Sequence, residues 1–277
     1  MERPLRIGAV SYLNTVPLVR GLPGMLPEAV LSLDHPSRLA DQLADGRLDV
    51  ALAPVVELAR HPEWSIVSTA CIGCRGPVLS VKVLFRKAPA EVRILALDEG
   101  SRTSAVLAQI LLAKTQAGRA KPQAAGGLRL EVLPVGASPL ESDADAVLVI
   151  GDRAIAAAPA EFCETWDLGE VWRRETGLPF VFAVWAARPG VDLSEVEPAL
   201  DAARDLGIRE VEAIADEQSA AMGLPRPLVL KYLREHLNFY LDAGERRGLD
   251  LYFREAAALG LIPRDFELRL NDCPAER

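Results

Sequence analysis

The sequence predicts an α/β protein of two lobes that enclose a central cleft, with two strands crossing between the lobes. Short apolar runs alternate with helical patterns along the chain, which indicates helices packed around largely parallel sheets. This pattern breaks near residues 86–92 and then resumes as a second α/β series. A length of 277 residues suits one large domain or two smaller lobes.

The first lobe is predicted to open with an apolar strand at residues 6–10. Residues 15–21 follow as a helix with Pro17 near its first turn, where proline is tolerated. Residues 37–44 form a second short helix, for which Ser37 is the predicted N-cap. Further strands are predicted at residues 48–53, 65–70 and 78–85.

The second lobe begins where Lys87, Pro89 and Glu91 interrupt the apolar pattern. A strand at residues 92–97 runs into a polar loop, and a strongly helical stretch follows at residues 103–114. The remaining predictions for this lobe are a polar surface connection at residues 115–127 and strands at residues 128–135 and 146–150.

The apolar run at residues 177–185 is predicted to return the chain to the first lobe. From Asp192 onward the pattern is almost wholly helical. The expected helices span residues 193–206, 208–222, 227–240 and 245–259.

This order predicts one lobe, a second lobe inserted into it, and a return to the first. The first lobe then comprises residues 1–86 and 184–277, and the second comprises residues 87–183. Two strands, near residues 80–85 and 180–186, would cross between the lobes and act as a hinge. The cleft between lobes joined in this way is the expected ligand site.

Composition excludes several classes of partner. Half of the residues are apolar and only 5% are aromatic, so the core should be aliphatic. The net charge of −8 argues against a nucleic-acid partner, which would require a basic face. Neither a signal-peptide core nor an apolar run of about 20 residues is present, so we expect a cytoplasmic protein with no membrane partner. The oligomeric state stays open.

Four cysteines allow two interpretations. Cys71 and Cys74 have the spacing of a redox pair or of half a zinc site, whereas Cys163 and Cys273 stand alone. A zinc site needs about four ligands, and no second pair follows. A turn and a strand, rather than a helix, are predicted after Cys74, and this favours structural thiols and no metal site.

Polar residues follow several predicted strands. In open parallel sheets, ligands bind beyond the carboxyl ends of the strands, so these loops are candidates for the cleft wall. Each hydroxyl has an alternative role as a helix cap, and Arg75-Gly76 has one as a plain turn. The candidates are Ser11, Tyr12 and Asn14 after the first strand, Ser101, Arg102, Thr103 and Ser104 in the second lobe, Gly151 and Asp152, and Thr176.

The candidate site lacks the motifs of many enzymes. No phosphate-binding loop, dinucleotide-binding glycine motif or hydrolase nucleophile elbow is present. The histidines, His35, His61 and His236, all lie outside the candidate loops. Hydroxyls, an amide, an arginine and backbone donors favour binding of a carboxylated ligand.

Six runs of residues together resemble the menaquinone biosynthesis protein A family, the chorismate dehydratases of the futalosine pathway. They span most of the first two-thirds of the chain in order. The second cysteine of the CIGC run stands where this family would carry a small residue such as serine, which supports an incidental cysteine pair. The runs are IGAVSYLNTVPL at residues 7–18, LDVALAPV at 48–55, CIGCRGPVLSV at 71–81, DEGSRTS at 98–104, LGEVW at 168–172 and TGLPFVFAVW at 176–185.

The resemblance implies a type-II periplasmic-binding-protein fold and a hydro-lyase without a cofactor. The implied reaction converts chorismate to 3-[(1-carboxyvinyl)oxy]benzoate and water. Loss of the C4 hydroxyl and the C3 proton makes the ring aromatic, so the protein has mainly to orient the substrate and exclude water.

The resemblance also implies roles for individual residues. Asn14 and Ser80 are expected at the reacting centre, where the substrate's own enolpyruvyl carboxylate would take the C3 proton. Asp152 is the alternative base. Arg102 with its neighbouring hydroxyls would hold a carboxylate, or would instead bridge the lobes as an ion pair. The implied substrate-binding residues are Ser11, Tyr12, Pro54, Arg75, Gly76, Ser101, Arg102, Thr103, Ser104, Gly151, Thr176 and Phe180.

Two rival functions remain at this point. The sister enzyme of the pathway shares the fold and processes cyclic dehypoxanthine futalosine, but it is expected to present a histidine in its cleft. A non-catalytic protein that binds small carboxylates is the second rival, and the missing export signal and DNA-binding segment argue against it.

Overall fold

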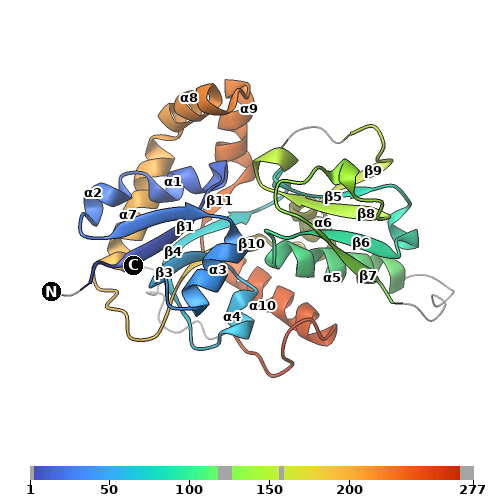
Figure 1. Ribbon diagram of the computed structural model, residues 1–277, viewed down its shortest axis with the longest axis horizontal. Helices are drawn as coiled ribbons and strands as arrows, with labels where there is room; N and C mark the ends of the chain where they lie inside the picture. The colour runs from blue at the N-terminus through green and yellow to red at the C-terminus, as the bar shows by residue number, and fades with distance from the viewer. Residues whose placement is uncertain (1–2, 118–126, 156–158, 269–277) are drawn as a thin grey trace.

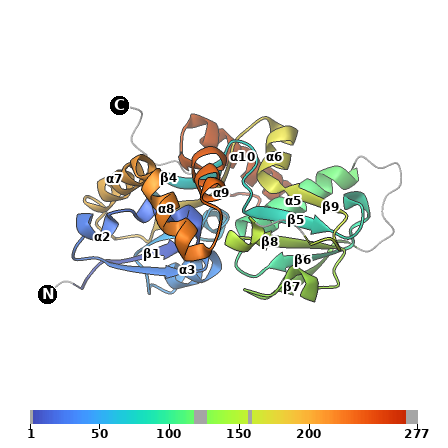
Figure 2. The same ribbon diagram turned by 90° about the horizontal axis from the view of Figure 1, so that it is seen from above.

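Figure 1 shows the computed structural model, which describes residues 3–117, 127–155 and 159–268. The chain forms two lobes that lie side by side, each with a twisted sheet covered by helices (Figures 1 and 2). No helix among the described residues is long and apolar enough to span a membrane.

The sheet of the first lobe contains six strands in the described part of the chain. β1 pairs in parallel with β2 and β3, whereas β10 runs antiparallel to both β3 and β4. In spatial order the strands are β11 (Asn238–Tyr240), β4 (Ser65–Cys74), β10 (Phe180–Ala187), β3 (Val50–Pro54), β1 (Arg6–Val10) and β2 (Val30–Asp34).

The second sheet contains five strands within the described residues. β6 pairs in parallel with β7 and β8, and β5 lies antiparallel between β8 and β9. In spatial order the strands are β7 (Arg129–Leu133), β6 (Ile94–Asp98), β8 (Ala146–Ile150), β5 (Val81–Phe85) and β9 (Glu164–Asp167).

Helices cover both sheets, so that strands such as β3, β8 and β10 are buried along their whole length and read as continuous apolar runs. The helices are α1 (Val16–Val19), α2 (Leu22–Met25), α3 (Pro36–Ala44), α4 (Glu57–Arg60), α5 (Thr103–Ala117), α6 (Leu168–Thr176), α7 (Val196–Arg209), α8 (Val211–Met222), α9 (Arg226–Lys231) and α10 (Ala243–Ala258).

The chain crosses between the lobes twice, but the prediction that the strands near residues 80–85 and 180–186 cross is wrong, because the connections before them do so. The first crossing is the segment between β4 and β5, and the second is the short connection between α6 and β10. β5 pairs only within the second sheet and β10 only within the first. Sheet membership therefore changes at residues 75–80 and 177–179, before the predicted lobe boundaries at residues 86/87 and 183/184.

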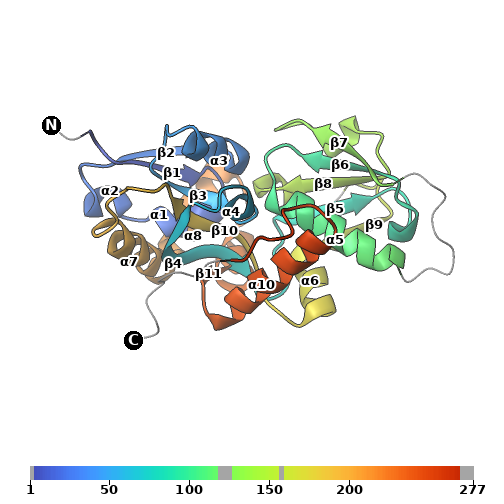
Figure 3. The same ribbon diagram turned by 90° about the horizontal axis from the view of Figure 1, so that it is seen from below.

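α10 contacts elements of both lobes. It packs against β10 of the first lobe and α5 of the second (Figure 3). The buried Tyr252 hydroxyl donates to the Thr103 carbonyl oxygen at 3.1 Å, and Lys114 pairs with Glu255 at 2.6 Å. The contact with Thr103 holds the N-terminus of α5, where candidate site residues lie, against α10.

Several predicted elements differ from the structure. Residues 227–240 were predicted as one helix, but α9 ends at Lys231, a π-helical turn follows, and β11 pairs with the edge of β4. The predicted Ser37 cap is also wrong, because His35 is the N-cap of α3 and Ser37 lies inside the helix. β2, β9 and α6 were not predicted. α5 continues to Ala117, and the rest of the predicted connection lies largely outside the described residues.

The buried carboxylate of Asp49 links residues at the start of the chain to the first sheet by hydrogen bonds. Asp49 accepts hydrogen bonds from Arg3 at 2.8 Å, from the Arg6 backbone at 3.0 Å and from Arg188 at 3.1 Å. Burial by itself raises the pKa of Asp49, but the hydrogen bonds from these arginines outweigh burial and leave the pKa well below its usual range.

Replacing this carboxylate should destabilise the protein. We expect Asp49→Asn to lower the free energy of unfolding by about 3 kcal/mol at pH 7, because three guanidinium groups lose a buried partner. Since the folded pKa is depressed, the Asp49 contribution is complete above pH 4 and is lost as the pH falls further. Urea unfolding at pH 7 and pH 3 measures both effects. Asp45→Asn, which removes an exposed partner of Arg47, should change stability by less than about 0.5 kcal/mol. An equal loss at pH 3 would contradict this account.

Candidate functional site

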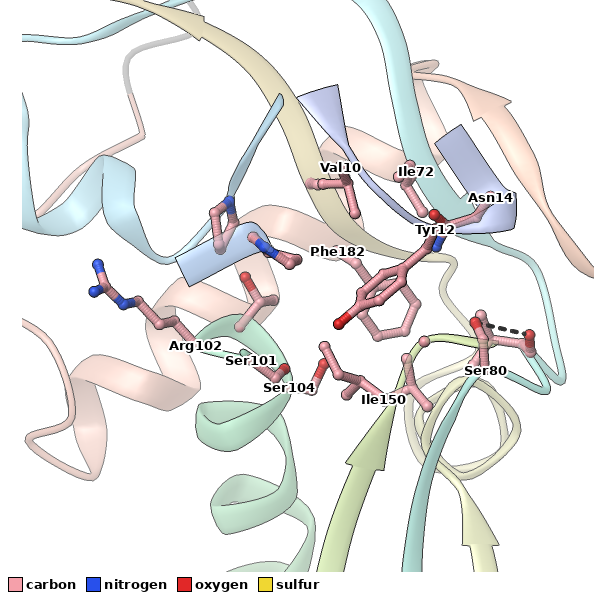
Figure 4. Close-up of a pocket in the computed structure, with 17 residues that line it drawn as sticks. Val10, Tyr12, Asn14, Ile72, Ser80, Ser101, Arg102, Ser104, Ile150 and Phe182 are labelled. Atoms are coloured by element: carbon pink, nitrogen blue, oxygen red, sulfur yellow. Dashed lines mark hydrogen bonds between the residues drawn. The ribbon is translucent and has the colours of Figure 1, made fainter. Parts of the chain in front are cut away.

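A pocket opens between the two lobes and contains about 510 Å³ of empty space, the solvent at its mouth included. Both lobes contribute side chains to it, as Figure 4 shows. The lining residues are Val10, Tyr12, Asn14, Pro36, Pro54, Ile72, Val78, Ser80, Val81, Ser101, Arg102, Thr103, Ser104, Ile150, Gly151, Phe182 and Ala183.

The loop after β1 supplies the first-lobe wall. β1 is buried from Ile7 to Val10, and the chain then turns through a 3₁₀ turn at Leu13–Thr15. Tyr12 precedes this turn, and its hydroxyl is hydrogen-bonded to Nδ1 of His35 at 3.2 Å. Burial, followed by the charge of Asp98, raises the pKa of Tyr12 to about 12, so its hydroxyl stays protonated at neutral pH.

Asn14 lies in this 3₁₀ turn and contributes to the pocket wall. Its Oδ1 accepts a hydrogen bond from the Thr15 hydroxyl at 3.3 Å, so the two amide N–H groups are the donors that remain for other partners. An amide in this position can donate to a ligand oxygen.

Ser80 lies at the end of the first crossing and is 1% exposed. Its hydroxyl donates to the Val78 carbonyl oxygen at 3.4 Å, and its own carbonyl accepts from Gly151 N–H at 2.9 Å. Leu79, just before it, has a φ of +60°, an unusual value for a leucine. Asp167 stabilises this backbone by accepting from the N–H groups of Val78 and Leu79 at 2.9 and 2.7 Å.

The N-terminus of α5 supplies the second-lobe wall. Ser101, Thr103 and Ser104 are buried there, where the positive end of the helix dipole favours an anion. The loop before the helix is shaped by Asp98, which accepts from Gly100 N–H at 3.0 Å and from Ile150 N–H at 3.2 Å. Hydroxyl groups and a helix end therefore face the amide of the first lobe.

Arg102 bridges the lobes, which is the alternative that the sequence left open. Its guanidinium pairs with Asp41 at 2.7 Å and with Glu57 at 3.2 Å, both in the first lobe. Figure 4 shows the Arg102 side chain directed away from Ser101 and Ser104. The arginine lines the edge of the pocket, but its charge is already shared by two carboxylates.

Asp152 also connects the lobes. Its two carboxylate oxygens lie 3.0 and 3.3 Å from the Leu13 backbone nitrogen, which donates to them from the other lobe. Burial raises the pKa of Asp152, and the hydrogen bond from Leu13 partly offsets that shift. Gly151 lines the pocket, whereas Asp152 does not.

Five further predicted binding residues lie outside the pocket lining. Ser11 is exposed, and Arg75 pairs with Asp242 and Glu245 at the start of α10. Gly76 packs on α6, since a Cβ at Gly169 would lie 2.5 Å from its carbonyl oxygen.

The other two residues, Thr176 and Phe180, have structural roles at the end of a helix and in the core. The Thr176 hydroxyl donates to the Trp172 carbonyl oxygen at 2.8 Å and ends α6. Phe180 packs edge-on against Trp172 and Tyr252. Phe182 lines the pocket in its place, because a β-bulge between Val181 and Ala183 breaks the alternation of β10.

Sequence analysis missed the apolar part of the pocket. These residues carry no chemical motif, and only Val10, Val81 and Ile150 have a signal that could have marked them, a position at the end of a strand. They suit a ligand with a hydrocarbon ring. They are Val10, Pro36, Ile72, Val78, Val81, Ile150, Phe182 and Ala183.

Cys71 and Cys74 are buried free thiols within β4, not at the start of a helix. Burial raises the pKa of Cys74 to about 12 and raises that of Cys71 further, so neither is a thiolate at neutral pH. The interpretation of both as structural thiols fits these surroundings. Cys163 is exposed, and Cys273 lies outside the described residues.

Comparison with known proteins places the chain in a family. Residues 5–258 match the family described as "Menaquinone biosynthesis". A curated relative, named chorismate dehydratase, from Thermus thermophilus is 29% identical, with the match covering 94% of this chain and 96% of the relative.

Solved structures establish the fold. Protein AF1704 from Archaeoglobus fulgidus has a TM-score of 0.74 at 16% identity and covers 94% of this chain and 99% of its own. A Candida albicans protein described as having the generic periplasmic-binding-protein fold has a TM-score of 0.59 at 10% identity, covering 94% of this chain and 91% of its own. The predicted periplasmic-binding-protein architecture is confirmed, and the chain belongs to the menaquinone biosynthesis family.

Proposed function

We propose that the protein is a chorismate dehydratase, a hydro-lyase that converts chorismate to 3-[(1-carboxyvinyl)oxy]benzoate and water. The observation that carries this proposal is the interlobe pocket, where Asn14 and Ser80 face the hydroxyl-rich N-terminus of α5 across an apolar floor. The relative from Thermus thermophilus carries the same activity in its name. The proposal includes a place in the futalosine pathway, a cytoplasmic location and no cofactor.

The pocket suits the parts of chorismate. The apolar side chains accommodate the ring, and Ser101, Thr103 and Ser104 with the α5 N-terminus bind a carboxylate. Hydrogen bonds to the ring carboxylate stabilise charge that develops when the proton leaves C3, because C3 is vinylogous to that group. Asn14 and Ser80 then donate to the departing C4 hydroxyl.

The reaction breaks one C–H bond and one C–O bond. The electron pair of the C3–H bond becomes part of the aromatic ring. The C4 hydroxyl group leaves with the electron pair of the C4–O bond and combines with the abstracted proton to form water. We assign the proton transfer to the substrate's own enolpyruvyl carboxylate. Asp152 is the weaker candidate because its carboxylate is bound to Leu13 N–H and lies outside the pocket lining.

The identity of the base can be tested with Asp152→Asn. Asparagine keeps an acceptor oxygen for Leu13 N–H but cannot accept the C3 proton. Because we assign that proton to the substrate carboxylate, we expect kcat within about three-fold of the wild type. A loss of roughly 100-fold or more would identify Asp152 as the base instead.

The pH dependence of stability tests a second property of Asp152, the raised pKa of its carboxyl group in the folded protein. A folded-state pKa above the ordinary value of 3.8 means that the ionised carboxylate is disfavoured by folding. The stability of the wild type relative to Asp152→Asn should therefore fall as the pH rises through the folded pKa. Asp152→Ala, which loses the interlobe hydrogen bond, should lower the melting temperature at pH 7.

One contact gives the sister-enzyme alternative some support. His35, predicted to lie outside the candidate loops, is hydrogen-bonded to Tyr12, a pocket residue. His35 itself does not line the pocket, and its Nδ1 is used by the Tyr12 hydroxyl.

Parallel incubations of the purified protein with chorismate and with cyclic dehypoxanthine futalosine distinguish the candidates. We expect consumption of chorismate alone. Consumption of the futalosine derivative would favour the sister enzyme, and chorismate binding without turnover would favour a carboxylate-binding protein.

A further inference from the structure

Tyr232 is a fully buried tyrosine that sequence analysis placed inside an ordinary helix. It opens a π-helical turn, Tyr232–His236, between α9 and β11. Single π-helical turns are rare in proteins, and those that do occur are frequently found at functional sites. This turn is tied to the first crossing, because Nδ1 of His236 is hydrogen-bonded to the Pro77 carbonyl oxygen at 3.0 Å.

The Ser80 and Asn14 side chains are near enough to the Tyr232 hydroxyl to influence its pKa. Burial raises the pKa of Tyr232 and the charge of Asp152 adds to this, whereas the neighbouring Ser80 and Asn14 side chains act to lower it. The hydroxyl nevertheless has no hydrogen bond of acceptable geometry to any described residue. The buried phenol therefore keeps an unused donor and unused lone pairs, although Tyr232 itself does not line the pocket.

The two neighbours are free to rearrange toward this phenol. The hydroxyl of Ser80 makes a donor contact at 3.4 Å, which is close to the limit for a hydrogen bond and is easily exchanged for another. The amide of Asn14 uses its oxygen for the Thr15 hydroxyl, which leaves its N–H groups as donors. Tyr232 can donate to Ser80 Oγ and accept from Asn14 at the same time.

We propose that Tyr232 is a positioning residue that acts through Ser80 and Asn14 when the substrate binds, an inference that rests on the dehydratase function proposed above. Its O–H donates to Ser80 Oγ, so that the serine proton points into the pocket at the departing C4 oxygen. Its oxygen accepts one N–H of Asn14, and the second N–H is left for the substrate. Tyr232 itself is absent from the pocket lining and transfers no proton.

Tyr232→Phe tests this role because it removes only the hydroxyl. We expect kcat for chorismate to fall about 10-fold, with KM changed less than three-fold, because the lost interaction forms fully only when C4–O breaks. The melting temperature should stay the same or rise, since a buried hydroxyl without a partner is removed. The pH profile of kcat should keep its shape, because Tyr232 stays neutral.

Tyr240→Phe is the matched control. It removes another phenol hydroxyl from the adjacent β11, where the partner is the exposed Asp205 at 3.1 Å. This variant should retain the wild-type kcat and KM.

A double variant tests whether the tyrosine acts through the serine. Adding Tyr232→Phe to Ser80→Ala should lower kcat by less than two-fold beyond Ser80→Ala alone. Full additivity would contradict the coupling, and wild-type kcat in Tyr232→Phe would overturn the proposal while leaving the dehydratase function intact. Absence of chorismate turnover by the wild-type protein would instead overturn the proposed function, and the role of Tyr232 with it.

Discussion

Asn14→Ala should lower kcat for chorismate dehydration by roughly 100-fold, the usual loss when one preorganised donor to a developing charge is removed. The amide is held by the 3₁₀ turn after β1, and its Oδ1 is fixed by the Thr15 hydroxyl at 3.3 Å. The amide is therefore already part of the pocket wall before any ligand arrives. Steady-state kinetics with purified variants measures the effect.

Ser11→Ala is the control for this substitution. Ser11 lies three residues before Asn14 but is exposed and outside the pocket lining, so its loss should leave kcat and KM unchanged. Both variants should melt within about 2 °C of the wild type, because neither side chain fills the core. If Asn14→Ala turned over chorismate at the wild-type rate, the assignment of the reaction centre would be wrong.

Gly151→Ala should damage both stability and activity. Gly151 has φ +75° and ψ −161°, a conformation almost restricted to glycine. A Cβ at this position would lie 2.8 Å from ring atoms of Tyr12 in the other lobe. The backbone would have to shift, and the hydrogen bond from Gly151 N–H to the Ser80 carbonyl would be lost with it. We expect about 3 kcal/mol of destabilisation and a fall of roughly 100-fold in kcat/KM.

Gly190→Ala separates backbone strain from the interlobe clash. Gly190 has φ +80°, but nothing lies within 4 Å of a Cβ built there. This variant should lose about 1 kcal/mol of stability and keep its kinetics. Chemical unfolding and chorismate assays of the two variants provide the comparison. Equal kinetic losses in both, or none in Gly151→Ala, would contradict the role of the Tyr12–Gly151 contact.

The positions of the loops were predictable because parallel strands end at one edge of a sheet. Asn14 and the Ser101–Ser104 run follow strands that sequence analysis proposed, whereas Ser80 was expected from the family resemblance, and all of them line one pocket. The two-lobe order followed from the interruption near residue 87 and the apolar run before Trp185.

Side-chain direction was not predictable in the same way. Asp152 and Arg102 occupy the expected loops, yet their charges bind Leu13 N–H and two carboxylates of the other lobe. Such partners are distant in sequence, and no local pattern specifies them. Phe180 was the predicted lining residue, but Phe182 lines the pocket, next to a β-bulge in β10 that no local pattern specifies.

The C-terminal part of the first lobe was the least predictable. Residues 227–240 have a helical pattern, but pairing of Asn238 with Gly73 of β4 ends the helix early. That pairing depends on a partner strand more than 150 residues away, and such tertiary contacts override local helix propensity. The π-helical turn that results begins at the buried Tyr232, so the incorrect helix prediction also concealed the residue that we propose acts through Asn14 and Ser80.

The most direct test of the proposed dehydration is a proton NMR time course of the purified protein with chorismate. We expect the ring protons to become aromatic while the vinyl protons of the enolpyruvyl group persist, as 3-[(1-carboxyvinyl)oxy]benzoate requires. Release of pyruvate with loss of the vinyl signals, or a chorismate spectrum that does not change relative to a protein-free sample, would contradict the proposed dehydration.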